Sequence, residues 1–220
     1  MLLFYINHVV TPFLLISMLF ASFASSTPTY NGIYCPNNTK YETNNNTVFQ
    51  TNLEVLLSSL FSNATLGSSS YTTAMGMGNS NAVNGVYLCR GDVSSATCTE
   101  CMATAVANIT TLCPNKSESI IWYDECMLRY TNTYFNPLSI DPRLNLWENE
   151  SISTSDLDKF NETLLSFLGS LASKAANSES ATKYSTGEWD FTEEIRVFGL
   201  AECVPGVTDD QCEGCLKKLL

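Results

Sequence analysis

Histidine and basic residues are scarce in this chain. Its 220 residues contain one histidine, His8, and 11 lysines and arginines against 22 aspartates and glutamates, which gives a formal net charge of −11 at pH 7. Nucleic acids and anionic membrane surfaces bind proteins through clustered Lys and Arg. We therefore expect no nucleic-acid partner, whereas a basic partner is compatible with the charge.

The motifs of common enzyme classes are missing as well. Histidine is the commonest general base, and none follows His8. The sequence has no Gly-rich phosphate loop, no H-E-x-x-H and no G-x-S-x-G. The acidic residues Asp209, Asp210 and Glu213 open a predicted helix, where the helix dipole favours negative charge. We predict a non-catalytic protein without a cofactor or a metal site.

Long apolar runs are confined to the start of the chain. Residues 11–24, TPFLLISMLFASFA, are uncharged and give way to small and polar residues. This run is shorter than the ~20 residues of a spanning helix, so we predict a signal peptide over residues 1–26. The alternative is an uncleaved membrane anchor, because no Lys or Arg precedes the run. Without a later apolar segment, the mature chain is predicted to have no membrane span and to be secreted.

Glycosylation sequons are consistent with secretion. An Asn in N-x-S/T, with no Pro in the middle, is an acceptor for N-linked glycans in secreted proteins. The candidate acceptors are Asn37, Asn45, Asn63, Asn108, Asn115, Asn149 and Asn161.

Cysteine is abundant, and its spacing repeats. Cys89, Cys98 and Cys101 form C-x8-C-x2-C, and the same spacing recurs 114 residues later (203 − 89 = 114). A fixed period indicates repeated structural units. The second triplet is Cys203, Cys212 and Cys215. Cys35, Cys113 and Cys126 bring the first unit to six cysteines, and the second has only its three.

A C-x2-C pair has three common interpretations: half of a zinc site, a redox pair, or part of a disulfide framework. A closed zinc site needs four ligands, which only cysteines could supply here. A redox pair needs a low-pKa thiolate near a helix N-terminus, and Cys98 and Cys101 lie in the early turns of the predicted helix. An oxidising compartment and the additional cysteines favour disulfides. Six cysteines allow fifteen pairings, and spacing cannot choose among them.

Periodicity and turn residues predict the same order of elements in both units. The first unit has a helix over residues 48–61, strands over 71–77 and 83–89, a helix over 92–112 capped by Ser94 or Ser95, and a strand over 120–130. In the second unit the helix spans 157–176, the strands span 184–191 and 195–203, and a helix begins at 208. Apolar residues at helical spacing mark the first helix at Phe49, Leu53, Leu56 and Leu60, and its counterpart at Phe160, Leu164, Phe167 and Leu171.

These elements predict an α+β fold in tandem domains, each with two helices packed on an antiparallel sheet. We place the first domain at residues 27–136, a linker at 137–147 and the second domain at 148–220. The second domain lacks counterparts of Cys113, Cys126 and the strand over 120–130. It is therefore predicted to be C-terminally truncated and, alone, to be unstable or to form dimers.

Three segments carry a family resemblance: CRGDVSSATCTECM with its echo CVPGVTDDQCEGCL, the run IIWYDECMLRYTNTYF, and YSTGEWDF. In these the chain resembles the ginkbilobin-homologous, or stress-antifungal, domain of plant cysteine-rich repeat secretory proteins and cysteine-rich receptor-like kinases. The resemblance covers everything after residue 26. It implies the disulfides Cys35–Cys113, Cys89–Cys98, Cys101–Cys126 and Cys203–Cys212, with Cys215 unpaired.

Lectins of this family bind mannose through an Asn, an Arg and a Glu. The matching positions hold Pro36, Ile120 and Thr131, so mannose binding at that site is not expected. The aromatic run offers Trp122, Tyr123, Arg129, Tyr130 and Tyr134, either as contacts for a protein partner or as residues packing a sheet.

The resemblance implies a secreted, disulfide-bonded recognition protein of the plant apoplast, active in stress or defence, whose ligand is an extracellular protein or glycan. The alternatives are a carbohydrate-binding antifungal lectin and a truncated ectodomain of a cysteine-rich receptor-like kinase. A homodimer or heterodimer is compatible with each.

Overall fold

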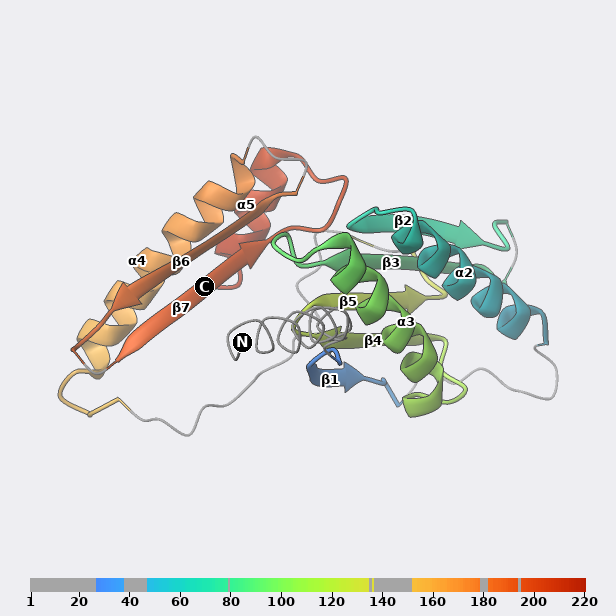
Figure 1. The fold of residues 1–220 in the computed structure, drawn as a ribbon, viewed down its shortest axis with the longest axis horizontal. Coiled ribbons are helices and arrows are strands. Elements are labelled where there is room, and N and C mark those ends of the chain that lie inside the picture. Colours follow the sequence, from blue (N-terminus) through green and yellow to red (C-terminus); the bar gives the residue numbers. More distant parts are fainter. Residues whose placement is uncertain are drawn as a thin grey trace, which may run out of the picture.

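The computed structural model describes residues 27–37, 47–78, 80–134, 136, 152–178, 182–193 and 195–220. The predicted signal peptide and linker lie outside these residues. The described chain forms two units, residues 27–136 and 152–220, each with helices on a sheet (Figure 1). Among the described residues, no helix has both the length and the apolar composition needed to cross a membrane.

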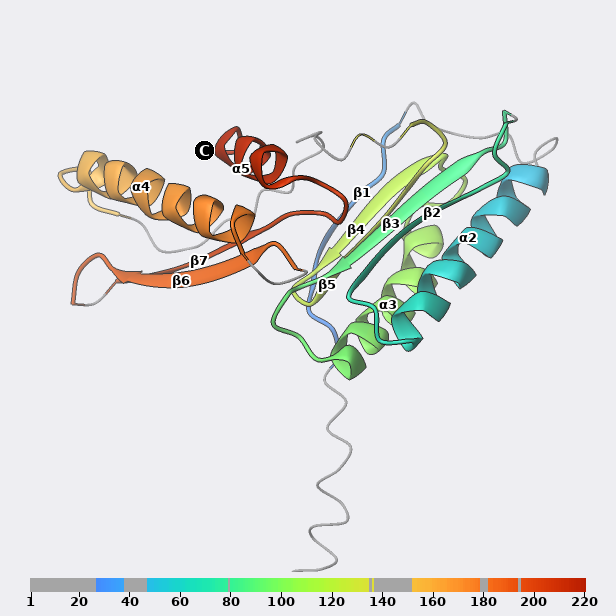
Figure 2. The same ribbon diagram turned by 90° about the horizontal axis from the view of Figure 1, so that it is seen from above.

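The first unit is a five-stranded antiparallel sheet covered by two helices. In chain order it contains β1 (Tyr30–Tyr34), α2 (Thr47–Thr65), β2 (Ser70–Met75), β3 (Val83–Cys89), α3 (Ser95–Leu112), β4 (Glu118–Tyr123) and β5 (Cys126–Thr131). The strands lie in the order β1-β4-β5-β3-β2. Both helices cover the same face of the sheet (Figure 2).

Two features of this sheet differ from the predictions. The single strand predicted over residues 120–130 is a hairpin, because Asp124 and Glu125 interrupt the apolar run and Trp122 pairs with Met127 across the turn. The segment before residue 35 forms β1, which was not predicted. It pairs with β4 through an irregular register around Gly32, and the dipeptide Asn31-Gly32 within it is a turn signal that obscures a strand pattern.

The predicted apolar stripe of α2 lies in the core. Phe49, Leu53, Leu56 and Leu60 are each at most 3% exposed. The helix packs closely on β3 at Gly85, where a Cβ atom would lie 2.6 Å from Cδ2 of Leu56. Glycine at this position therefore sets how near the helix lies to the sheet.

The second unit repeats part of the first. It contains α4 (Leu157–Ala176), β6 (Tyr184–Asp190), β7 (Arg196–Glu202) and α5 (Asp209–Lys217). Thr208 caps α5 as Ser94 caps α3, and in each case the side chain accepts a hydrogen bond from the backbone N–H three residues later. Gly199 of β7 meets α4 as Gly85 meets α2, with a built Cβ 2.6 Å from Cδ1 of Leu171. The 114-residue offset therefore extends from the cysteines to the caps and the packing.

The core of the second unit is much smaller. Leu171, Ala175 and Ala201 form one buried cluster, and Ala176, Val207 and Cys212 form another. Among the described residues its sheet has two strands, so β4 and β5 have no counterpart there. Half-buried Phe167 and Leu168 complete the packing under α4.

Candidate functional site

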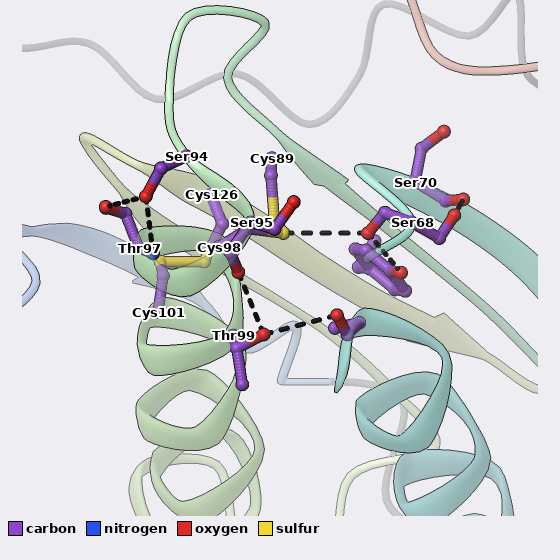
Figure 3. Close-up of a disulfide and its surroundings, with 12 residues drawn as sticks. Ser68, Ser70, Cys89, Ser94, Ser95, Thr97, Cys98, Thr99, Cys101 and Cys126 are labelled. Carbon is purple, nitrogen blue, oxygen red and sulfur yellow. Dashed lines mark hydrogen bonds between the residues drawn. A yellow bond between two sulfur atoms is a disulfide. The ribbon is translucent and has the colours of Figure 1, made fainter. Parts of the chain in front are cut away.

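The beginning of α3 is held to the sheet by two disulfides (Figure 3). Cys98 bonds to Cys89 of β3, and Cys101 bonds to Cys126 of β5. Cys89 and Cys126 are register partners on neighbouring strands, and residues three apart on a helix share a face. The C-x2-C spacing therefore lets one helical turn reach two adjacent strands.

The other two bridges lie at the ends of the units. Cys35–Cys113 joins the end of β1 to the end of α3, and Cys203–Cys212 repeats the Cys89–Cys98 bridge in the second unit. These four pairs are the ones that the family resemblance implies. Cys215 is half-buried and belongs to none of the four bridges. No group of three or more His, Cys, Asp or Glu residues among the described positions could hold a metal ion.

The positions that correspond to the mannose site of lectins present no exposed polar side chain. Pro36 is buried after β1, and Ile120 and Thr131 are buried at 3% and 1% exposure. Lys116 donates a hydrogen bond from Nζ to the Pro36 carbonyl oxygen. A sugar would find no convergent hydrogen-bonding side chains here.

The aromatic run divides between the two faces of the sheet. Tyr123 and Tyr130 are buried in the core under the helices, as sheet packing predicts. Trp122 and Arg129 are half-buried and fall on the opposite face, where Arg129 pairs with Glu118 at 2.8 Å. Tyr134 is 86% exposed. The side chains of Trp122 and Tyr134 are therefore accessible to a ligand, whereas those of Tyr123 and Tyr130 are packed in the core.

The two units meet at residues 90–92, which follow the Cys89 bridge. Gly91 lies against the ring of Tyr184 at the start of β6, and a built Cβ would come 2.6 Å from Cγ of that ring. The backbone N–H of Gly91 also donates a hydrogen bond to the carboxylate of Glu202. Tyr184 and Glu202 are cross-strand partners, so one hairpin end of the second unit rests on this loop.

A groove of about 410 Å³ opens beside this contact. It contains residues of both units, and we call it the inter-unit groove. Its lining residues are Asn31, Leu88, Arg90, Trp122, Tyr123, Asp124, Cys126, Met127, Leu200 and Glu202. Sequence analysis singled out Trp122 but not Glu202, because only folding brings the end of β7 to the loop of the first unit.

Charged groups around the groove are unevenly paired. Arg90 donates to Asp92 at 2.6 Å and to the backbone oxygen of Asp124 at 3.1 Å. The hydrogen bond to Arg90 lowers the pKa of Asp92. Asn31 donates to the carboxylate of Asp124 at 2.8 Å. These interactions hold Asn31, Arg90 and Asp124, three of the polar side chains that line the groove.

Unlike Arg90 and Asp92, Glu202 forms no ion pair with a described residue. Burial, and secondarily the negative charge of Asp92, raise its pKa to about 7. Its Oε1 atom is buried without a hydrogen-bond partner among the described residues. Burial, and secondarily the negative charge of Asp92, also raise the pKa of Tyr184. The groove therefore combines an apolar wall, an indole and an under-compensated carboxylate.

The model of the family described as salt stress response/antifungal matches residues 34–133 and 148–220. The chain belongs to this family. Its fold is that of a solved member: it superposes on the tandem DUF26 ectodomain of the Arabidopsis thaliana cysteine-rich receptor-like protein PDLP8 with a TM-score of 0.68. The two are 28% identical, with 86% of this chain and 84% of the other covered. The α+β fold with antiparallel strands and disulfides is thereby confirmed.

Relatives within the salt stress response/antifungal family include kinases and a secreted protein. The chain is 39% identical to cysteine-rich receptor-like protein kinase 25 of Arabidopsis thaliana over 199 residues, which cover 89% of this chain and 29% of the kinase. It is 32% identical to cysteine-rich repeat secretory protein 38 of the same plant over 141 residues, 64% of this chain and 55% of the relative. The chain thus spans less than a third of the length of that kinase.

Proposed function

We propose that this chain is a secreted, non-catalytic extracellular recognition module that acts in plant stress or defence in the apoplast. The observation that carries the proposal is the disulfide framework, in which eight cysteines tie helices to strands across both units. Such bridges form and persist in oxidising compartments. The secreted relative and the ectodomain fold support the same location.

The domain division and the glycosylation sites belong to this proposal. The family match leaves residues 134–147 uncovered, which supports a linker between a domain at 27–136 and a shorter one at 148–220. Asn37, Asn115 and Asn161 are exposed and suit glycans. Asn63 and Asn108 lie on helices and are half-buried, and Asn108 hydrogen-bonds to the Tyr123 hydroxyl. Asn45 and Asn149 lie outside the described residues.

Secretion from plant cells tests the location. We expect the chain expressed with residues 1–26 to accumulate in the extracellular fluid, to lose mass on deglycosylation, and to begin near residue 27 by N-terminal sequencing. A control that lacks residues 1–26 should stay inside the cell. Retention of the full chain in cell membranes, or recovery without glycans, would contradict the proposal.

The second candidate is the ectodomain of a cysteine-rich receptor-like kinase. The alignment with kinase 25 favours this candidate, because it covers 29% of the kinase. That share is the size of an ectodomain, and the rest of the kinase is much longer. Reading the transcript past the codon for Leu220 tests it. A membrane span and kinase motifs downstream would support the kinase, and a stop codon would favour the secreted module. The third candidate, an antifungal lectin, is tested by glycan arrays. Glycan binding that survives substitution at position 36, 120 or 131 would point to another sugar site.

A further inference from the structure

The inter-unit groove has a surplus of negative charge. Asp124 and Glu202 line it and Asp92 lies beside it, whereas Arg90 is the one cationic side chain among its described lining residues. Arg90 is already engaged by Asp92 and by the Asp124 backbone oxygen. The charge of Arg90 and the Gly91 N–H lower the pKa of Glu202 only in part, and Glu202 forms no ion pair with any described residue. Glu202 is half-buried with its Oε1 atom fully buried; such a carboxylate is costly without a paired cation, and an external cation would lower that cost.

The uncharged part of the lining suits the stem of a long cationic side chain. Leu88 and Met127 come from the first unit and Leu200 from the second, and half-buried Trp122 adds an indole. Lys and Arg side chains bury their methylene stems on apolar surface while the charged head stays with polar groups. A guanidinium or ammonium group is also attracted to the face of an indole ring.

We propose that the inter-unit groove binds a Lys or Arg side chain of a basic peptide segment, with Glu202 as the main anionic contact and Trp122 beside the stem. This rests on the proposed recognition function and names the chemistry of its partner. The net charge of −11 attracts a basic partner at long range. Because a carboxylate shares its charge over both oxygens, a cation on the groove side also compensates the buried Oε1.

The site makes binding depend on pH in a defined direction. The pKa of Glu202 is about 7 in the unoccupied groove, so a cation binds after the carboxyl has lost its proton. The deprotonated fraction is about 0.09 at pH 6 and about 0.9 at pH 8, while Arg stays charged at both. Affinity for an Arg peptide is therefore about tenfold higher at pH 8 than at pH 6.

Two matched tripeptides test the proposal on the full chain: acetyl-Gly-Arg-Gly-amide and the same peptide with neutral citrulline in place of Arg. Binding is followed by NMR at the indole N–H of Trp122, assigned with W122F. We expect saturable shifts with the Arg peptide, at least tenfold weaker binding of the citrulline peptide, and the pH dependence above. Equal affinity for the two peptides, or binding unchanged between pH 6 and 8, would overturn the proposal.

Two variants distinguish binding in the groove from a general effect of net charge. Glu202→Gln keeps the shape and removes a buried charge, so it should fold at least as well as the natural chain, bind the Arg peptide at least tenfold more weakly and lose the pH dependence. Glu100→Gln removes one charge from the exposed surface of α3 and should bind normally. Equal losses of affinity in the two variants would show that binding depends on general charge and would overturn the proposal. Sedimentation experiments in which self-association of the chain displaces the peptide would also overturn it, because the groove would then bind a second copy of the chain. Neither result bears on secretion, so the proposed function fails or stands separately.

Discussion

Glu202 shows how one residue can couple stability to pH. Burial raises its pKa from 4.5 to about 7, so the folded state holds its proton more tightly than the unfolded chain does. The stability that this proton contributes is fully present below about pH 4.5 and is lost as the pH rises through 7. Above that range the folded protein carries an under-compensated buried charge.

We predict that Glu202→Gln is more stable than the natural chain at pH 8, by about 2 kcal/mol after allowance for solvent screening. The two proteins should have nearly the same unfolding free energy at pH 4.5. Urea denaturation at both pH values measures the difference. An identical pH dependence in the two proteins would show that Glu202 does not titrate near 7.

At the scale of secondary-structure elements, two glycines allow a helix to pack closely on a sheet. Gly85 and Gly199 occupy the same place in the two units, and at both the side chains of the facing helix fill the space that a Cβ would need. Neither has positive φ, so the restriction comes from packing and not from the backbone. The repeated cysteine spacing is thus accompanied by a repeated steric requirement.

We predict that Gly85→Ala and Gly199→Ala each lower the unfolding free energy by about 1–3 kcal/mol, because α2 or α4 must move away from the sheet. Gly214→Ala is the matched control. It lies in α5, where no described atom other than those of its chain neighbours and helix backbone comes within 4 Å of the built Cβ, so alanine should stabilise the helix by about 0.5–1 kcal/mol. Circular dichroism during urea denaturation measures all three, and a stabilising Gly85→Ala would refute the packing argument.

Sequence patterns predicted the helices better than the strands. The apolar spacing of α2 predicted its buried face, since a helix repeats every 3.6 residues and needs no partner to define a face. The run over residues 120–130 predicts one strand, because its aromatic and β-branched residues outweigh the two consecutive polar residues, Asp124 and Glu125, at which the chain turns. A strand has to pair before its ends are fixed, and the pairing lies elsewhere in the chain.

At the scale of the whole molecule, the bridge between Cys35 and Cys113 closes the longest loop, with a sequence separation of 78. The double variant Cys35→Ser with Cys113→Ser should lose about 4 kcal/mol of unfolding free energy by the chain-entropy estimate. Denaturation of the oxidised proteins measures it. Mass-spectrometric mapping should recover the four bridges of the structure, and a different pairing would overturn the expected loss.

The contact between the units offers a second prediction at this scale. Gly91→Ala places a Cβ against the ring of Tyr184, so the loop and β6 have to separate. We expect a larger radius of gyration by small-angle X-ray scattering and faster proteolysis within residues 137–147, with the melting of the first unit little changed. Gly214→Ala again serves as the control, and a scattering curve identical to that of the natural chain would contradict the prediction.

The sequence by itself determined the repeat, the helical faces and the class of protein. Each of these depends on spacing along the chain: a constant offset of 114 residues, a 3.6-residue period, and cysteines placed to reach neighbouring elements. The tertiary structure alone decided which carboxylate became buried and which surfaces met. Glu202 and Gly91 are 111 positions apart in the numbering (202 − 91 = 111), and their contact and the raised pKa of Glu202 arise only when the hairpin of one unit packs on the loop of the other. Solvation and charge pairing depend on distance in space, which spacing along the chain does not specify.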